Sequence, residues 1–271
     1  MHSIFHLLKR DIMMRLHDCK ATFLFISLAA LLIYFVSFWN SYKSGQLDQH
    51  HILNNYMNVF HSLNFFELHE LYSQHKFSIP FTWICFQVFP LLIIGHFSYN
   101  DFQKSGTLLI PKLNNKIAFW LSKMFSLCFF CLIIWIVWFS FYFIFFLIFK
   151  GTIVIGEIKP VLALMLIQFL VTVVYTLVFE TLTYFFSFII SLVISIVYLI
   201  ISIFVQTKFF FTSLAIPGRW YFADHSPINM MYSNGSAIHF PIFIGVITLF
   251  CTLCCFIGLL LIKKIDILGD Y

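Results

Sequence analysis

Long uncharged apolar runs are the feature that most constrains this chain. Several of them reach the roughly 20 residues that an α-helix needs to cross a hydrocarbon core about 30 Å thick. The longest lies between Val161 and Gln206, where Glu180 is the only formally charged residue. Charged residues make up 10% of the chain, against about 25% in soluble domains, and a β-barrel would need short alternating segments instead. The sequence therefore predicts an all-α, polytopic membrane protein.

The apolar runs divide into six predicted spans. As one helix, residues 161–206 would measure about 69 Å at 1.5 Å per residue, twice the bilayer thickness. We therefore divide this run into two spans joined around Glu180 to Ser187. The whole chain, 1–271, is expected to form one transmembrane domain with spans over 21–39, 79–97, 117–149, 160–180, 187–206 and 239–262.

Residues 1–18 have the pattern of an amphipathic helix. Their apolar side chains recur at helical spacing, and the basic ones fall elsewhere on the helix. The apolar set is Ile4, Phe5, Leu8, Ile12 and Leu16, and the basic set is Lys9, Arg10 and Arg15. Such a helix suits the membrane interface, and the alternative is a plain polar tail.

Two other segments are too polar or too broken to cross a bilayer. Residues 41–77 predict one or two amphipathic helices on the outer surface. Residues 207–238 are aromatic and interrupted by Pro217, Gly218, Pro227 and Gly235, which suits re-entrant half-helices covered by protein. An ordinary surface loop is equally compatible with this second pattern.

The distribution of basic residues predicts the orientation. Six spans place both termini on the same side as residues 98–116, and this side carries ten of the 16 Lys and Arg residues. The positive-inside rule then places the termini and residues 98–116 in the cytoplasm.

Composition and motifs exclude several classes of function. The basic residues flank apolar runs, where they meet lipid headgroups, so the net charge of +5 does not indicate nucleic-acid binding. Most of the seven cysteines lie in apolar runs, where a cysteine is usually a small hydrophobe. The chain contains no GxxxxGK[ST], HExxH or GxSxG motif. We therefore expect no catalytic residues and no cofactor in this chain.

A few polar residues remain as candidates for a site. Glu180 could face a translocation path, or it could lie at headgroup level or cap a helix. Arg219 and Trp220 stand at a turn in the segment before the last span, where they could contribute to a gate. The fragment Glu67-Leu68-His69-Glu70 could offer metal ligands, but its spacing matches no metal signature, so we predict no metal site.

Ser98 to Lys123 form a polar island between two predicted spans. The island carries five charged residues, a Gly-Thr step and a proline: Asp101, Lys104, Gly106, Thr107, Pro111, Lys112, Lys116 and Lys123. An amphipathic segment fixed to two spans could convert the movement of a docked soluble partner into a shift of those spans. Contact of its lysines with lipid headgroups is the simpler alternative.

With this island, the chain resembles the membrane subunit of bacterial type-2 ABC exporters, the ABC-2 permease family. Members carry an acidic residue shortly before a Gly-Thr step, then a Ser/Asn-Arg/Lys step and a lysine seven residues later. The matching residues here are Asp101, Gly106 and Thr107, Asn115 and Lys116, and Lys123. Members often have a proline just before the Ser-Arg step, whereas this chain has Leu113 at that place and its proline at Pro111.

The resemblance implies that 98–116 is a coupling helix against which a cytoplasmic ABC ATPase docks. The residues implied in docking are Asp101, Phe102, Gly106, Thr107, Leu108, Leu109, Lys116 and Lys123. Gly106 would allow a tight turn, Thr107 could cap a helix, and Phe102, Leu108 and Leu109 could fill a groove on the partner. ATP and Mg²⁺ would bind to that partner.

The resemblance also implies a function in a bacterial plasma membrane. The chain would pair with a second permease subunit, identical or different, and export an amphipathic or hydrophobic substrate. An antimicrobial, lantibiotic-type or toxin peptide is the leading expectation. The alternatives are export of a drug, a lipid or a lipid-linked glycan, and a non-transporting sensor or accessory subunit.

Overall fold

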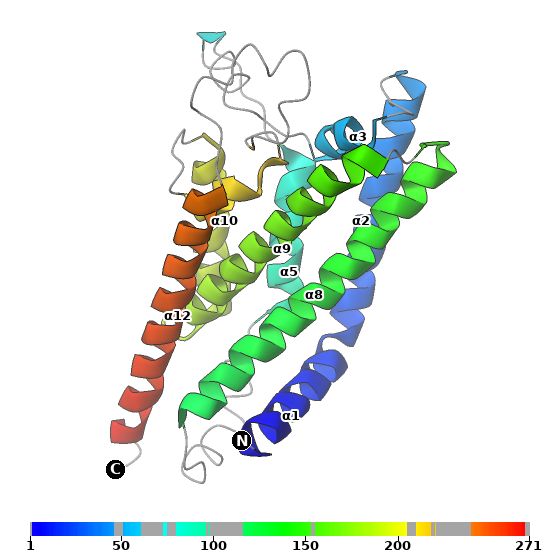
Figure 1. Ribbon diagram of the computed structural model, residues 1–271. Coiled ribbons are helices and arrows are strands. Elements are labelled where there is room, and N and C mark those ends of the chain that lie inside the picture. Colours follow the sequence, from blue (N-terminus) through cyan, green and yellow to red (C-terminus); the bar gives the residue numbers. More distant parts are fainter. Residues whose placement is uncertain are drawn as a thin grey trace.

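The computed structural model describes residues 2–45, 51–60, 73–74, 80–95, 97, 116–152, 155–204, 210–217, 220 and 240–268. Almost all of these residues are helical (Figure 1). Most of the predicted coupling segment, including Asp101, Phe102, Gly106 and Thr107 to Leu109, lies outside the described residues, as does Arg219.

Four helices are long and apolar enough to cross a membrane, which indicates a membrane-embedded protein. They are α2 (Lys20–Lys43), α8 (Lys116–Ile148), α9 (Ile155–Thr183) and α12 (Phe240–Leu268). Two shorter apolar helices, α5 (Phe81–Ile94) and α10 (Phe188–Phe204), have 14 and 17 residues and fall within the remaining two predicted spans.

Gly95 explains why α5 is shorter than the predicted span over 79–97. It follows the last helical residue with φ of +57°, a backbone conformation that glycine adopts without a Cβ clash. Its N–H donates to the carbonyl of Leu91 at 2.8 Å and closes the last turn. The helix therefore ends at Ile94, three residues before the predicted end of the span at Phe97.

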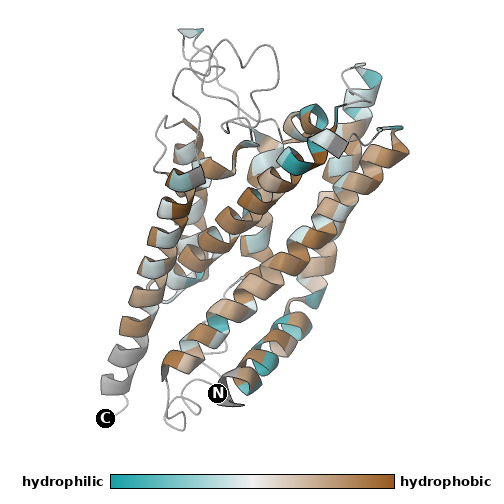
Figure 2. Ribbon diagram, in the orientation of Figure 1, coloured by the Kyte–Doolittle hydropathy of each residue, from teal (hydrophilic) through white to brown (hydrophobic). Residues whose placement is uncertain are grey.

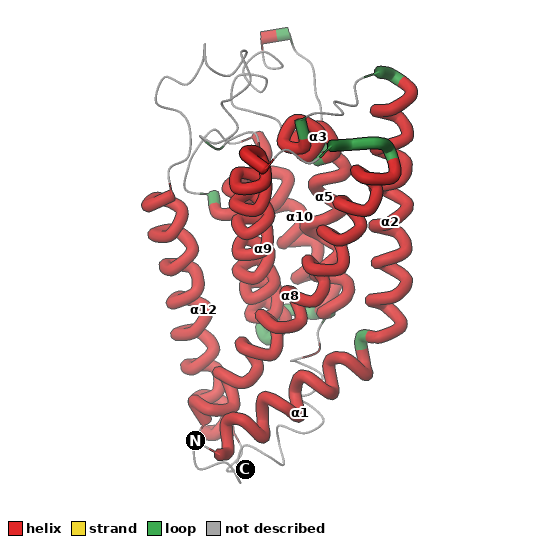
Figure 3. The backbone as a smooth tube through the Cα atoms, turned by 45° about the vertical axis from the view of Figure 1, so that its right-hand side comes forward, coloured by secondary structure: helices red, strands yellow, loops and turns green. Residues whose placement is uncertain are grey.

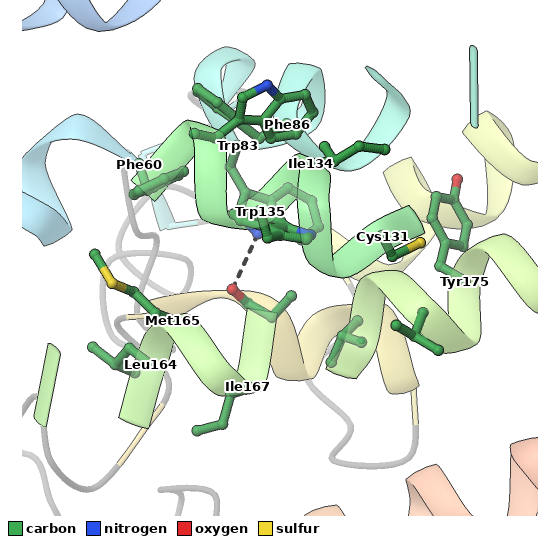
Figure 4. Packing of buried hydrophobic residues seen from close by; sticks show 14 of the residues in the cluster. Phe60, Trp83, Phe86, Cys131, Ile134, Trp135, Leu164, Met165, Ile167 and Tyr175 are labelled. Carbon is green, nitrogen blue, oxygen red and sulfur yellow. Dashed lines mark hydrogen bonds between the residues drawn. The ribbon is translucent and has the colours of Figure 1, made fainter. Parts of the chain in front are cut away.

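Helix α9 lies at the centre of the bundle (Figures 1 and 3). Of its apolar window, 67% is buried inside the protein, compared with 17% for α12. Much of the surrounding core is aromatic, and Figure 4 shows Trp135 of α8 between Phe86 of α5 and Met165 of α9. Large apolar side chains on the outer faces of α2, α8 and α12 stay exposed, as expected of surfaces that face lipid.

Two amphipathic helices lie at opposite ends of the bundle. Helix α1 (His2–Asp18) packs along the beginning of α8, and α3 (Ile52–Val59) packs on the first turns of α9 at the other end. Figure 2 shows hydrophilic residues gathered on α1 and around α3, with hydrophobic residues along the helices between them. The bundle therefore has two polar ends and an apolar middle.

A short 3₁₀-helix, η3 (Phe211–Ala215), comes from the segment predicted to re-enter the bundle. All five of its residues are buried, and it packs against α9, α10 and α12. Trp220 is also buried and donates its indole N–H to the carbonyl of Leu214 at 2.7 Å. This irregular backbone is covered by protein, which satisfies the requirement that lipid imposes on it.

Gly258 gives a test of the contact between α12 and α8. A Cβ added at Gly258 would lie 2.1 Å from the Trp120 indole, whereas one added at Gly245 of the same helix would meet open space. We expect Gly258→Ala to destabilise the fold by about 1–3 kcal/mol through overpacking. The measurement is the thermal unfolding midpoint in detergent, with Gly245→Ala as the matched control. Equal midpoints for the two variants would contradict this contact.

Candidate functional site

Helix α1 turns two charged side chains, Asp11 and Arg15, toward the bundle. Leu7, Asp11, Arg15 and Cys19 are buried at four-residue spacing, and both charged members are 0% exposed. Phe5 is 68% exposed on the other side of the helix, where lipid can cover it. Such an arrangement suits the helix predicted to lie in the membrane interface, where lipid can cover an apolar face.

Asp11 ties α1 to α8. Its carboxylate accepts a hydrogen bond from the Lys123 ammonium at 3.0 Å and another from the Ser122 hydroxyl at 2.6 Å. Arg10 approaches the same carboxylate from its own helix, with Nη2 at 2.7 Å. The carboxylate is thus surrounded by donors, as a buried charge requires.

Arg15 ties α1 to α9. Its guanidinium donates to both carboxylate oxygens of Glu180, at 2.9 and 3.3 Å, and its Nε donates to the Ser126 hydroxyl at 3.1 Å. A bidentate pair of this kind fixes orientation as well as distance. Burial lowers the pKa of Arg15, but the charge and hydrogen bonds of Glu180 outweigh burial, so the pKa lies above its usual value.

Phe97 lies against both cations of the network. The Arg15 guanidinium is 4.6 Å from the centre of its ring, and the Lys123 ammonium is 5.3 Å from it. Both distances are within the range of cation–π contacts. Phe97 is the last described residue before the segment 98–115, and Lys116 begins α8 directly after that segment.

The buried ion pairs Asp11–Lys123 and Arg15–Glu180, whose cations both lie against Phe97, are together called the charge network. Its four buried charges balance, and the partly exposed Arg10 adds a further cation at Asp11. Removing one partner of a buried ion pair leaves an uncompensated charge, which typically costs about 3–5 kcal/mol. Ionisable groups buried in a membrane protein are uncommon and often functional. The network fixes the relative positions of α1, α8 and α9 at one end of the bundle.

The predicted site residues are placed as follows. Glu180 has its carboxylate bound by Arg15, three residues before the end of α9. The side chain of Lys123 is 1% exposed and is paired with Asp11 inside the protein. Trp220 packs edge-on against Phe243, and Lys116 is placed as the first residue of α8.

The roles of Asp11 and Arg15 do not follow from the helical pattern of residues 1–18. That pattern places Arg15 with Lys9 and Arg10 away from the apolar set and gives no role to Asp11. Two signals were present: Asp11 and Arg15 are four residues apart on one helix face, and Glu180 in an apolar run requires a cation nearby.

Among the described residues, no group of three or more His, Cys, Asp or Glu side chains is placed to hold a metal ion. The fragment Glu67 to Glu70 lies outside them. Comparisons with protein-family models, with curated proteins and with solved structures found no match for this chain.

A pair of variants tests whether Arg15 and Glu180 act as an ion pair. We expect Arg15→Met to lower the free energy of unfolding by about 3–5 kcal/mol, because the Glu180 carboxylate is left without its cation. Arg15→Met combined with Glu180→Met should recover most of this loss, because no buried charge then remains unpaired. The measurement is chemical unfolding in mixed micelles, and Asp18→Asn, at an exposed carboxylate of α1, is the control. A double variant as unstable as the single one would refute the pairing.

Proposed function

We propose that this chain is the membrane subunit of an ATP-driven exporter, in which residues 98–115 receive a separate cytoplasmic ATPase. One observation carries the proposal: the charge network brackets this segment, with Phe97 on one side and Lys123 on the other. The sequence contains no P-loop, so the energy of ATP hydrolysis would have to come from another chain.

The charge network would transmit movement of the docked ATPase to the helices of the bundle. A force on residues 98–115 would reach the beginning of α8 directly, and through Asp11 and Arg15 it would also reach α1 and α9. Because breaking these ion pairs is costly, the three helices would shift together as a rigid body. Since α9 is the most buried of the long helices, its displacement would repack the core.

The exposed residues on and next to α1 support a cytoplasmic position for the end of the bundle that holds the charge network. Lys9 and Lys20 are exposed beside the exposed apolar side chains Phe5, Met13 and Leu16. Exposed lysines at an interfacial helix attract anionic headgroups, which are enriched on the cytoplasmic leaflet. This agrees with the orientation expected from the basic residues of the whole chain.

The transported substrate would be amphipathic or hydrophobic, with a peptide of the antimicrobial or toxin type as the first choice. The outer faces of α8 and α12 support this choice, because they are apolar and partly aromatic along their length, as at Phe129 and Phe256. The subunit would work as a dimer with a second permease subunit.

Co-purification from native membranes tests the proposal. The tagged protein should bring down a P-loop ATPase, and the complex in liposomes should hydrolyse ATP faster when its peptide substrate is added. Absence of any ATPase from the purified complex would overturn the proposal. A bound ATPase that no substrate stimulates and that drives no transport would indicate a sensor subunit.

Variants in the predicted coupling segment test the docking surface. We expect Phe102→Asp to weaken ATPase binding about tenfold or more, a loss of about 1.4 kcal/mol, because it places a charge in an apolar groove. Gly106→Val should act in the same direction by opposing a tight turn. Phe102→Leu, which keeps an apolar side chain, is the matched control. Binding is measured with purified ATPase and the protein in nanodiscs, and unchanged affinity in both variants would exclude this segment as the docking surface.

A further inference from the structure

Helix α9 carries a stripe of buried polar side chains that continues from the charge network. Its members follow at four-residue spacing and are 0–3% exposed: Gln168, Thr172, Thr176 and Glu180. Residues four apart lie on one face of a helix. A polar stripe buried within an apolar bundle is costly unless its groups are hydrogen-bonded.

Each member of the stripe contacts a different neighbouring helix. Gln168 accepts a hydrogen bond from the Tyr56 hydroxyl of α3, and Thr172 Oγ1 lies 3.2 Å from Gln87 Oε1 of α5. Further along, Thr176 Oγ1 lies 3.5 Å from Cys131 Sγ of α8. Together with the Glu180–Arg15 pair, these contacts fix the position of α9 against four other helices.

A second carboxylate stands in the first turn of α9, at the opposite end of the bundle. Glu157 is hydrogen-bonded to the His51 ring through one oxygen, and its other oxygen accepts the backbone N–H of Leu53 at 3.3 Å. The Tyr142 hydroxyl adds a hydrogen bond to the carbonyl of Ile52 at 2.9 Å. The N-terminal turn of α3 is therefore held by α9 through Glu157 and by α8 through Tyr142, just as α1 is held by α9 through Arg15 and by α8 through Asp11.

Glu157 and Glu180 are 23 residues apart in one helix, or about 35 Å at 1.5 Å per residue. This length covers a hydrocarbon core of about 30 Å. Helix α9 thus holds α1 near one end through Glu180 and α3 near the other through Glu157.

We propose that α9 couples the two ends of the bundle, so that release of α1 or α3 from its carboxylate loosens the other. The Thr172 and Thr176 hydroxyls also donate to carbonyls of α9 itself, at 2.8 and 2.9 Å, whereas the side chains of Gln168 and Glu180 are hydrogen-bonded to other elements of the bundle. A shift of α9 that frees one end therefore strains the contacts along its whole length, because packed interiors transmit strain. The proposal does not depend on the exporter function, although in an exporter it would carry an event at the ATPase side to the opposite side.

Two cysteines, the native Cys19 and one introduced at Val59, report on whether α1 and α3 are released. Cys19 is 6% exposed beside Arg15, and burial raises its pKa to about 11, so it reacts slowly with a maleimide, which needs the thiolate. Val59→Cys places a second thiol on the buried face of α3, where Val59 is 3% exposed. Each reporter is studied in the full-length chain with the other cysteines replaced, except Cys131, which is 0% exposed and contacts Thr176. The protein is held in nanodiscs, which leave both faces accessible.

Glu157→Gln should accelerate labelling of Cys19 about fivefold or more, and Glu180→Gln should accelerate labelling of Val59→Cys by a similar factor, because a coupling free energy is reciprocal. His51→Ala releases α3 without changing α9 and should also accelerate Cys19 labelling. The exposed Lys159 of α9 provides the control, and Lys159→Gln should leave both rates unchanged.

Labelling at one end alone would overturn the coupling. If Glu157→Gln and His51→Ala expose Val59→Cys but leave the Cys19 rate unchanged, α3 is released independently of α1. If neither reporter responds, Glu157 does not hold α3 and the proposal also fails. Circular dichroism and size-exclusion profiles equal to those of the parent exclude general unfolding as the source of faster labelling. ATPase binding can be measured on the same samples, so a failure of the exporter proposal is seen separately.

Discussion

The cost of an unpaired charge inside an apolar bundle governs the architecture at one end of this protein. Glu180 lies in a run that is otherwise free of formal charge, and the protein neutralises it with Arg15 at 2.9 Å. That pairing requires α1 to turn a charged face inward and leaves its apolar face for lipid. The same face brings Asp11 to Lys123 at 3.0 Å, so the position of α8 follows from the same requirement.

The helices were predictable from sequence because lipid imposes a simple rule on length and polarity. The six predicted spans coincide with helices, and the turn between α9 and α10 falls within the junction predicted around Glu180 to Ser187. The early end of α5 was not predictable from hydropathy, because the backbone conformation of Gly95 ends the helix before the predicted end of the span. Most of the predicted docking segment falls outside the described residues, so its conformation remains a prediction.

The charge network was harder to predict for two reasons. Arg15 and Glu180 are 165 residues apart, and Asp11 and Lys123 are 112 apart, so no local pattern links them. The apolar stripe of residues 1–18 also marks a different face of the helix from the one it would mark in a soluble protein. In water an apolar stripe marks the face that packs inward, whereas Leu16 and Phe5 of α1 are exposed. In a lipid environment, it is the charged stripe that needs protein as its partner.

This difference explains why polar contacts hold so many of the helices together here. Apolar faces gain little from leaving lipid for protein, because lipid tails are as apolar as leucine, so helix association depends on close packing and interhelical hydrogen bonds. Gly258 against Trp120 is a close-packed contact of this kind. The stripe on α9 supplies the hydrogen bonds, and the carboxylates Glu157 and Glu180 supply them at its two ends. Moving Gln168 or either carboxylate away from its partners would leave a buried polar group unpaired, so the position of α9 is tied to those of both α1 and α3.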